Sequence, residues 1–98
     1  MSTLVQIQPT EKEFMGAVVE YLRLKNWLVY HPFDSRRSEP GFPDLVCVKD
    51  RVVWIELKVD GGNLSVHQRK WLDKLEAAGE ETYVFFPCDW PTIKKVMK

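Results

Sequence analysis

The segment Gly41–Lys58 reads G-F-P-D-L-V-C-V-K-D-R-V-V-W-I-E-L-K. Two apolar runs within it, Leu45–Val48 and Val52–Ile55, are separated by polar residues 49–51, and this pattern predicts a β-hairpin. Because the runs are apolar, we expect a buried hairpin, and the rest of the chain is interpreted around it.

Three ionisable residues lie where a buried hairpin should be apolar: Asp44 at its mouth, and Glu56 and Lys58 at the far end of its second strand. Side chains alternate between the two faces of a strand, so Glu56 and Lys58 are expected on one face. A two-residue turn would place Asp44 on the opposite face from Glu56. A three-residue turn at residues 49–51, or a bulge, would place Asp44 directly across from Glu56.

Two converging carboxylates repel each other, and in a half-buried site one of them would hold a proton unless a cation intervened. Hard oxygen ligands without Cys or His suit Mg²⁺ or Mn²⁺. Such a cation can bind a phosphodiester and lower the pKa of a water molecule, and the ammonium of Lys58 can neutralise charge that develops on phosphorus. The hairpin therefore predicts a metal-dependent nuclease.

Composition narrows the possible classes of protein. With 98 residues, 45% hydrophobic and 29% charged, the chain has the size and balance of one globular domain over residues 1–98, with 1–9 as a loose lead-in. A net charge of zero disfavours a protein that coats nucleic acid, so a DNA-binding surface would have to be a local patch.

Two cysteines, Cys47 and Cys88, have no metal-ligand spacing, and free thiols suit a reducing compartment. The chain shows neither a signal-peptide pattern nor an apolar run of membrane-spanning length. We therefore expect an intracellular, cytoplasmic protein without a membrane partner, of the kind that a phage or a bacterium encodes.

The remaining segments predict an α/β fold with the order αβββαβα and a central mixed four-stranded sheet flanked by helices. Apolar periodicity and turn residues place helices at 10–25, 65–78 and from residue 91 onward, strands at 27–32 and 82–87, and a loop at 33–43. The side chains expected to face the core from the second helix are Trp71, Leu72, Leu75 and Ala78. Three further tryptophans are expected in the core or on a dimer surface: Trp27, Trp54 and Trp90.

Each of the first two helices begins with a capping-box pattern, Thr10 with Glu13 and Ser65 with Gln68. Glu11 and Gln68 fall on the helix faces that should be buried. Glu11 either stabilises the helix N-terminus through the dipole or points an acid into a site. Gln68 either only closes the capping box or also supports that site.

Three motifs resemble the VRR-NUC (virus-type replication-repair nuclease) family of the PD-(D/E)XK nuclease superfamily. They are Gly41-Phe42-Pro43-Asp44, Trp54-Ile55-Glu56-Leu57-Lys58 and Gly61-Gly62-x-Leu64-Ser65-x-x-Gln68, and the extended run through Gln68 is the most specific. The likeness spans Thr10 to about Phe86. It implies a stand-alone nuclease domain with the restriction-endonuclease-like αβββαβ core, followed here by a short C-terminal helix.

The resemblance also implies a role for each matching residue. The implied Mg²⁺ or Mn²⁺ ligands are Asp44, Glu56, the backbone carbonyl of Leu57 and Glu11. Lys58 would be the catalytic lysine and Gln68 would support the site. Family members often have Gln where this chain has Met15, so the motif of the first helix is incomplete. Stand-alone members resemble Holliday-junction resolvases, which implies a homodimer that cuts branched DNA.

Other interpretations of these residues remain open. Asp44 could be a turn acid after Pro43, and Glu56 and Lys58 could be charges that protect an exposed edge strand from aggregation. The functional alternatives are a nuclease for flap, duplex or single-stranded DNA, and a non-catalytic nucleic-acid-binding module of the same fold. The candidate phosphate-binding residues are Arg36, Arg37, Lys49, Arg69 and Lys70. Two histidines, His31 and His67, are left outside the catalytic set.

Overall fold

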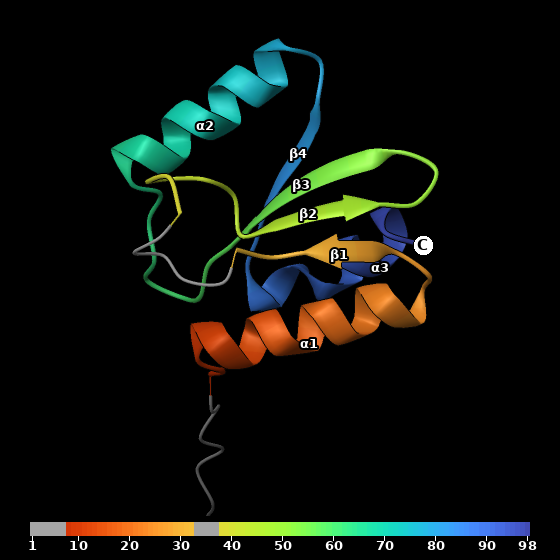
Figure 1. The fold of residues 1–98 in the computed structure, drawn as a ribbon. Helices are drawn as coiled ribbons and strands as arrows, with labels where there is room; N and C mark the ends of the chain where they lie inside the picture. The colour runs from red at the N-terminus through yellow and green to blue at the C-terminus, as the bar shows by residue number, and fades with distance from the viewer. Residues whose placement is uncertain (1–7, 33–37) are drawn as a thin grey trace, which may run out of the picture.

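The structure is a computed structural model, and it describes residues 8–32 and 38–98. Its helices and strands follow the predicted order (Figure 1), with a 3₁₀ turn before the last helix as an addition. In chain order they are α1 (Glu11–Leu24), β1 (Leu28–Tyr30), β2 (Leu45–Val48), β3 (Val52–Leu57), α2 (Val66–Ala77), β4 (Glu81–Phe85), η1 (Pro87–Asp89) and α3 (Trp90–Val96). The second strand of the hairpin continues past its apolar run through Glu56, as predicted, and ends at Leu57, one residue before Lys58.

The sheet has the order β1-β2-β3-β4. The β1/β2 and β2/β3 pairs are antiparallel and the β3/β4 pair is parallel, so the predicted mixed four-stranded sheet is confirmed. A parallel neighbour requires a crossover connection, which α2 supplies between β3 and β4. Within the described part of the chain, every helix is too short or too polar to cross a bilayer.

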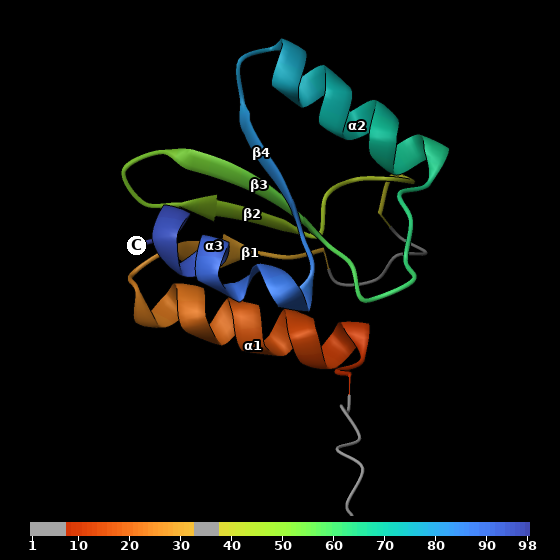
Figure 2. The same cartoon turned by 180° about the vertical axis from the view of Figure 1, so that it is seen from behind.

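The two faces of the sheet are covered unequally. Helices α1 and α3 lie together on one face and α2 lies on the other (Figures 1 and 2). The closed core is on the α1/α3 face, where alternate residues of β2 and β3 meet both helices. Its buried side chains include Phe14, Val18 and Leu22 of α1, Leu45 and Cys47 of β2, Val53, Ile55 and Leu57 of β3, and Ile93 and Met97 at the C-terminus.

On the other face of the sheet, α2 buries fewer side chains than the sequence suggested. Leu72 is the one fully buried residue of α2, Leu75 is half-buried, and Ala78 is exposed, contrary to its expected place in the core. Trp71, also expected in the core, is half-buried and packs edge-to-face on Phe42, with ring centroids 5.1 Å apart. The reason is position: α2 lies against β4 and the loop before the hairpin rather than across the centre of the sheet.

The other three tryptophans differ in their burial. Trp27 is in the core, with 2% of its surface exposed. Trp54 is half-buried, and its indole N–H donates to Glu80 over 2.9 Å. Trp90 is also half-buried and packs edge-to-face on Phe14 of α1, with ring centroids 6.1 Å apart. All three are therefore accounted for by contacts within the chain.

The hairpin turn has the length that the site requires. The register pairs Val48 with Val52, which leaves the three residues 49–51 in the turn, and it ends at Leu45 opposite Ile55. One further step of the same register places Asp44 opposite Glu56. The prediction that the two carboxylates share one face of the sheet is confirmed.

Gly41 holds the loop before the hairpin directly against the first turn of α2. Its φ of +84° lies in the left-handed region that favours glycine. A Cβ at this position would collide with the carbonyl group of His67 and would lie 2.6 Å from the backbone nitrogen of Gln68. The absence of a side chain at Gly41 therefore sets how closely α2 approaches Asp44.

Replacing Gly41 with alanine tests this close approach, and Gly61→Ala is the matched control. Gly61 has nearly the same φ, +83°, but open space around it. We expect Gly61→Ala to cost about 1–2 kcal/mol from backbone strain alone. Gly41→Ala should cost roughly 1–3 kcal/mol more, because the backbone of α2 must shift. Urea unfolding of both variants measures the difference, and equal losses would contradict the proposed contact.

Candidate active site

Glu56 is the buried acid at the end of β3, with 1% of its surface exposed. The backbone N–H of Asp44 donates to its Oε1 over 3.2 Å, and Nε2 of Gln68 donates to its Oε2 over 2.6 Å. Nζ of Lys58 lies 3.7 Å from the same Oε2. The carboxylate is therefore held by groups from the start of β2, the end of β3 and the first turn of α2.

Asp44 lies across from Glu56, at the mouth of the hairpin. Its Oδ2 accepts a hydrogen bond of 2.8 Å from the backbone N–H of Leu57, and its own backbone N–H donates to Glu56. These contacts show that Asp44 is more than a turn acid. They also show that Glu56 and Lys58 are not charges on an exposed edge, because β3 lies between β2 and β4.

Burial dominates the electrostatics of this pair. Burial first, and then the negative charge of Asp44, raise the pKa of Glu56 to about 8, although Lys58 opposes the shift. Burial also raises the pKa of Asp44, against the lowering effect of its hydrogen bond from Leu57. Without a cation, the pair therefore retains a proton at neutral pH, as expected for two carboxyl groups in one half-buried site.

Glu11 does not occupy the position expected from its helix. It is the first residue of α1 and is exposed, whereas the buried stripe begins only at Phe14. The first turn of α1 extends past the core, and the helix begins there with the capping box of Thr10 and Glu13. Nevertheless, the charge of Glu11 contributes to raising the pKa of Asp44, so its carboxylate lies within electrostatic range of the site.

Gln68 has both of the roles that the sequence left open. It closes the capping box with Ser65, since its Oε1 accepts from the Ser65 N–H over 2.9 Å and its own N–H donates to Ser65 Oγ over 3.1 Å. The remaining amide nitrogen of the same side chain donates to Glu56. The cap therefore fixes the side chain in the orientation that supports the buried acid.

The backbone carbonyl of Leu57 is available on the same side. In an extended strand the N–H and C=O of one residue point toward the same neighbouring strand, and the N–H of Leu57 points to Asp44. Continuing the hairpin register places Pro43 opposite Leu57, and proline has no N–H with which to donate to that carbonyl. Pro43 thus donates no hydrogen bond to this oxygen, which lies beside the two carboxylates.

This donor set fits a hard divalent cation. Within residues 8–32 and 38–98, no three His, Cys, Asp or Glu side chains converge to hold a metal by themselves. Two carboxylates and one carbonyl oxygen are nevertheless typical of Mg²⁺, which keeps several waters and takes further ligands from substrate phosphate. A cavity of about 160 Å³ opens beside Asp44 and Gln68, and Met15 of α1 and the loop from residue 38 to residue 43 line it.

The sequence matches the VRR-NUC domain family over residues 3–85. The chain belongs to the VRR-NUC family. One solved structure described as a VRR_NUC domain is 20% identical, with a TM-score of 0.70, over 89% of this chain and 92% of the other. A second, described as a VRR_NUC domain protein, is also 20% identical, with a TM-score of 0.68, over 85% of this chain and 82% of the other. A search of curated proteins gave no match.

VRR-NUC is a nuclease family, so this is a nuclease-type domain, and a nuclease domain binds nucleic acid. The structural likeness supports the α/β fold with a restriction-endonuclease-like core. At 20% identity the likeness to the solved structures is a likeness of fold. The carboxylate pair and Lys58 are therefore described from the side chains of this VRR-NUC domain itself and not from those structures.

The predicted phosphate-binding residues are dispersed. Arg69 and Lys70 are exposed on α2, whereas Lys49 lies in the hairpin turn and donates to the carbonyl of Lys98 at the C-terminus. The other two predicted contacts, Arg36 and Arg37, lie outside the described residues. Sequence reasoning missed the packing of Gly41 on α2 and the cavity beside Asp44, although the glycine before the Phe-Pro-Asp run was a signal of close backbone approach.

The raised pKa of Glu56 predicts how the stability of the metal-free protein depends on pH. Below pH 4.5 the group is protonated in both the folded and the unfolded state. Between about pH 4.5 and about 8 the unfolded chain releases this proton and the folded chain retains it, so stability should fall as pH rises. At about 1.4 kcal/mol per pKa unit, the loss should reach a few kcal/mol.

Glu56→Gln should abolish most of this loss, because the amide has no proton to release. Urea unfolding in EDTA at a series of pH values measures both slopes. Glu20→Gln, which changes an exposed acid of α1, is the control and should retain the slope of the unmodified protein. Identical slopes for the unmodified protein and Glu56→Gln would show that Glu56 titrates normally.

Proposed function

We propose that this domain is a Mg²⁺- or Mn²⁺-dependent DNA endonuclease of the PD-(D/E)XK type. The observation that carries the proposal is the buried Glu56 carboxylate, which accepts from the backbone N–H of Asp44 and lies 3.7 Å from the ammonium of Lys58. A fold whose stability is small gains nothing from a buried acid placed against a half-buried one that repels it. A divalent cation compensates both charges, and a phosphodiester is the substrate that such a site can bind.

The proposed ligands are Asp44, Glu56 and the carbonyl of Leu57, with Glu11 as an additional acid from α1. A divalent cation held by these residues would supply a Lewis acid for the scissile phosphate and for a bound water molecule. The ammonium of Lys58 then stabilises the negative charge that develops on the phosphorus oxygens, or holds the attacking water. Gln68 keeps one oxygen of Glu56 oriented through its hydrogen bond.

The catalytic set can be tested by cleavage of labelled four-way junction, flap, linear duplex and single-stranded DNA with Mg²⁺, Mn²⁺ or EDTA. We expect cleavage only with a divalent cation. Asp44→Asn, Glu56→Gln and Lys58→Ala should each lower the rate by roughly 10²-fold or more, as for other groups that stabilise transition-state charge. Two exposed positions supply controls, Glu20→Gln and Lys94→Ala, and these should cleave like the unmodified protein.

The same experiment distinguishes a nuclease from a non-catalytic DNA-binding module. A non-catalytic DNA-binding module would bind the DNA panel and leave every strand intact with either metal. Cleavage that persists in EDTA, or in folded Glu56→Gln and Lys58→Ala variants, would refute the proposed chemistry. The ranking of the four substrates decides between a junction-resolving enzyme and one that acts on flaps, duplexes or single strands.

We further propose a homodimer that acts on branched DNA, because two symmetric cuts require two sites related by a two-fold axis. An apolar surface supports this proposal. It lies on the same face of the sheet as Glu56, at the edge formed by β1. This face points away from the α1/α3 core. Its exposed members are Leu28 (74% exposed), Tyr30 (62%), Val48 (39%) and Val52 (39%). A second copy of the chain can cover such a surface, since apolar area of this kind is typical of an interface.

The dimer can be tested by sedimentation equilibrium. Leu28→Lys should shift the protein from dimer to monomer, because it places a charge in the proposed interface. Leu24→Lys is the matched control, because Leu24 is equally exposed, at 75%, but lies on α1. A monomeric unmodified protein, or the same effect from both variants, would overturn the proposed interface.

A further inference from the structure

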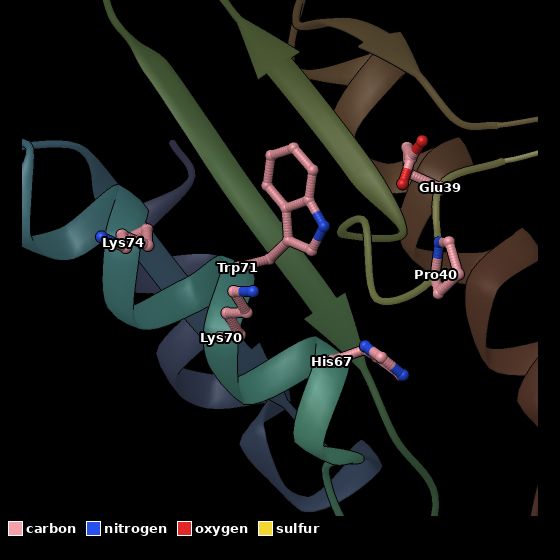
Figure 3. Close-up of a pocket in the computed structure, with 6 residues that line it drawn as sticks. All are labelled: Glu39, Pro40, His67, Lys70, Trp71 and Lys74. Carbon is pink, nitrogen blue, oxygen red and sulfur yellow. The ribbon is translucent and has the colours of Figure 1, made fainter.

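A second cavity lies beside the proposed active site and has a different chemistry. It measures about 410 Å³ and lies between α2 and the loop that leads to Asp44 (Figure 3). Four of its lining residues come from α2 and two from the loop. They are His67, Lys70, Trp71 and Lys74 on the helix, and Glu39 and Pro40 on the loop.

This cavity adjoins the cavity at Asp44. Glu39 and Pro40 line both, so this short segment forms the wall between them. The helix also joins the two sites, because Gln68, which supports Glu56, is next to His67 and one turn before Trp71. Gly41 holds the same loop on the same turn of α2. A DNA strand with its scissile phosphate at Glu56 therefore has this cavity beside it along α2.

The lining offers three different kinds of contact. Lys70 and Lys74 are one helical turn apart, so their ammonium groups lie on one side of α2 and suit an anion. Trp71 is half-buried on Phe42, which leaves a preformed aromatic wall on the cavity. The carboxylate of Glu39 on the opposite side can accept hydrogen bonds from amino or ring N–H groups (Figure 3).

An anionic group, a planar ring and N–H donors occur together in a nucleotide. A free phosphate would use the lysines and would be repelled by Glu39. Intact duplex DNA presents phosphates but no open base face, because its bases are stacked and paired. An unpaired base can stack on Trp71, and such stacking tolerates any base because each has a π-face.

We propose that this cavity binds one unpaired nucleotide of the DNA strand that enters the active site. This inference rests on the proposed nuclease function and names its substrate class as DNA with an unpaired nucleotide beside the scissile phosphate. In this arrangement Lys70 and Lys74 bind the flanking phosphates, Trp71 stacks on the base, and Glu39 accepts from its edge. The exposed basic residues of α2 thus act with an aromatic partner rather than as dispersed charges.

The test measures binding in EDTA, so that no cleavage occurs. The probes are a single-stranded oligodeoxynucleotide with one 2-aminopurine and the same sequence closed into a duplex. We expect the 2-aminopurine fluorescence of the single strand to be quenched on binding. Trp71→Leu should weaken single-strand binding by about 5- to 100-fold, the range for loss of one stacked base, and Trp71→Phe should retain most of it.

A second variant removes positive charge and leaves the packing of Trp71 on Phe42 unchanged. It allows the proposal to be tested even if Trp71→Leu fails to fold. Lys70→Ala with Lys74→Ala should weaken single-strand binding more than duplex binding. Lys94→Ala with Lys95→Ala removes the same charge from exposed positions of α3, on the other face of the sheet, and should have little effect. Equal losses for single strand and duplex, or for both lysine pairs, would overturn the proposal.

The two proposals fail separately. Loss of quenching in the α2 variants without any metal-dependent cleavage would leave a nucleotide-binding site and refute the nuclease. Cleavage that needs Glu56, in a protein whose Trp71→Leu variant still binds and quenches the single strand normally, would refute the nucleotide cavity and leave the nuclease.

Discussion

The structure depends on how a buried carboxylate is tolerated at the end of β3. Glu56 is almost wholly buried next to a second acid, Asp44, and both have raised pKa values. The start of β2 and the first turn of α2 each contribute a hydrogen-bond donor to this group, and Lys58 contributes an opposite charge. The three-residue turn brings Asp44 across, the capping box orients Gln68, and Gly41 lets α2 approach closely enough to reach it. If one of these is lost, the buried carboxyl group of Glu56 loses one of the contacts that hold it in place.

The unequal covering of the sheet makes such a site possible. The α1/α3 face holds the closed apolar core, which supplies most of the buried apolar surface. The α2 face contributes little to that core, since only Leu72 is fully buried from its helix. This face can therefore carry acids, a lysine, two cavities and an exposed apolar surface without dividing the core. Stability and the proposed chemistry lie on opposite faces of one sheet.

Helix α2 has more functions than its pattern indicated. Its first turn supports Glu56 through Gln68, and its next turns present Lys70, Trp71 and Lys74 to the neighbouring cavity. Because one rigid helix carries both groups, a substrate that binds in the cavity would be held in a defined position relative to the carboxylates. Elements that join a binding surface to a reacting group in this way give more precise positioning than loops.

The sequence alone determined the order of the elements and both capping boxes, because these follow from periodicity within short segments. It predicted the pairing of Asp44 with Glu56 on condition of a three-residue turn, and the strand register supplied that turn. Only the tertiary structure decided that Trp71 lines a cavity, that Glu11 is exposed, and that Pro43 lies opposite Leu57. Those features depend on how far a helix extends past the core and on which segments meet across the sheet. Local spacing carries no information about such long-range distances, so the carboxylate pair was predictable and its surroundings were not.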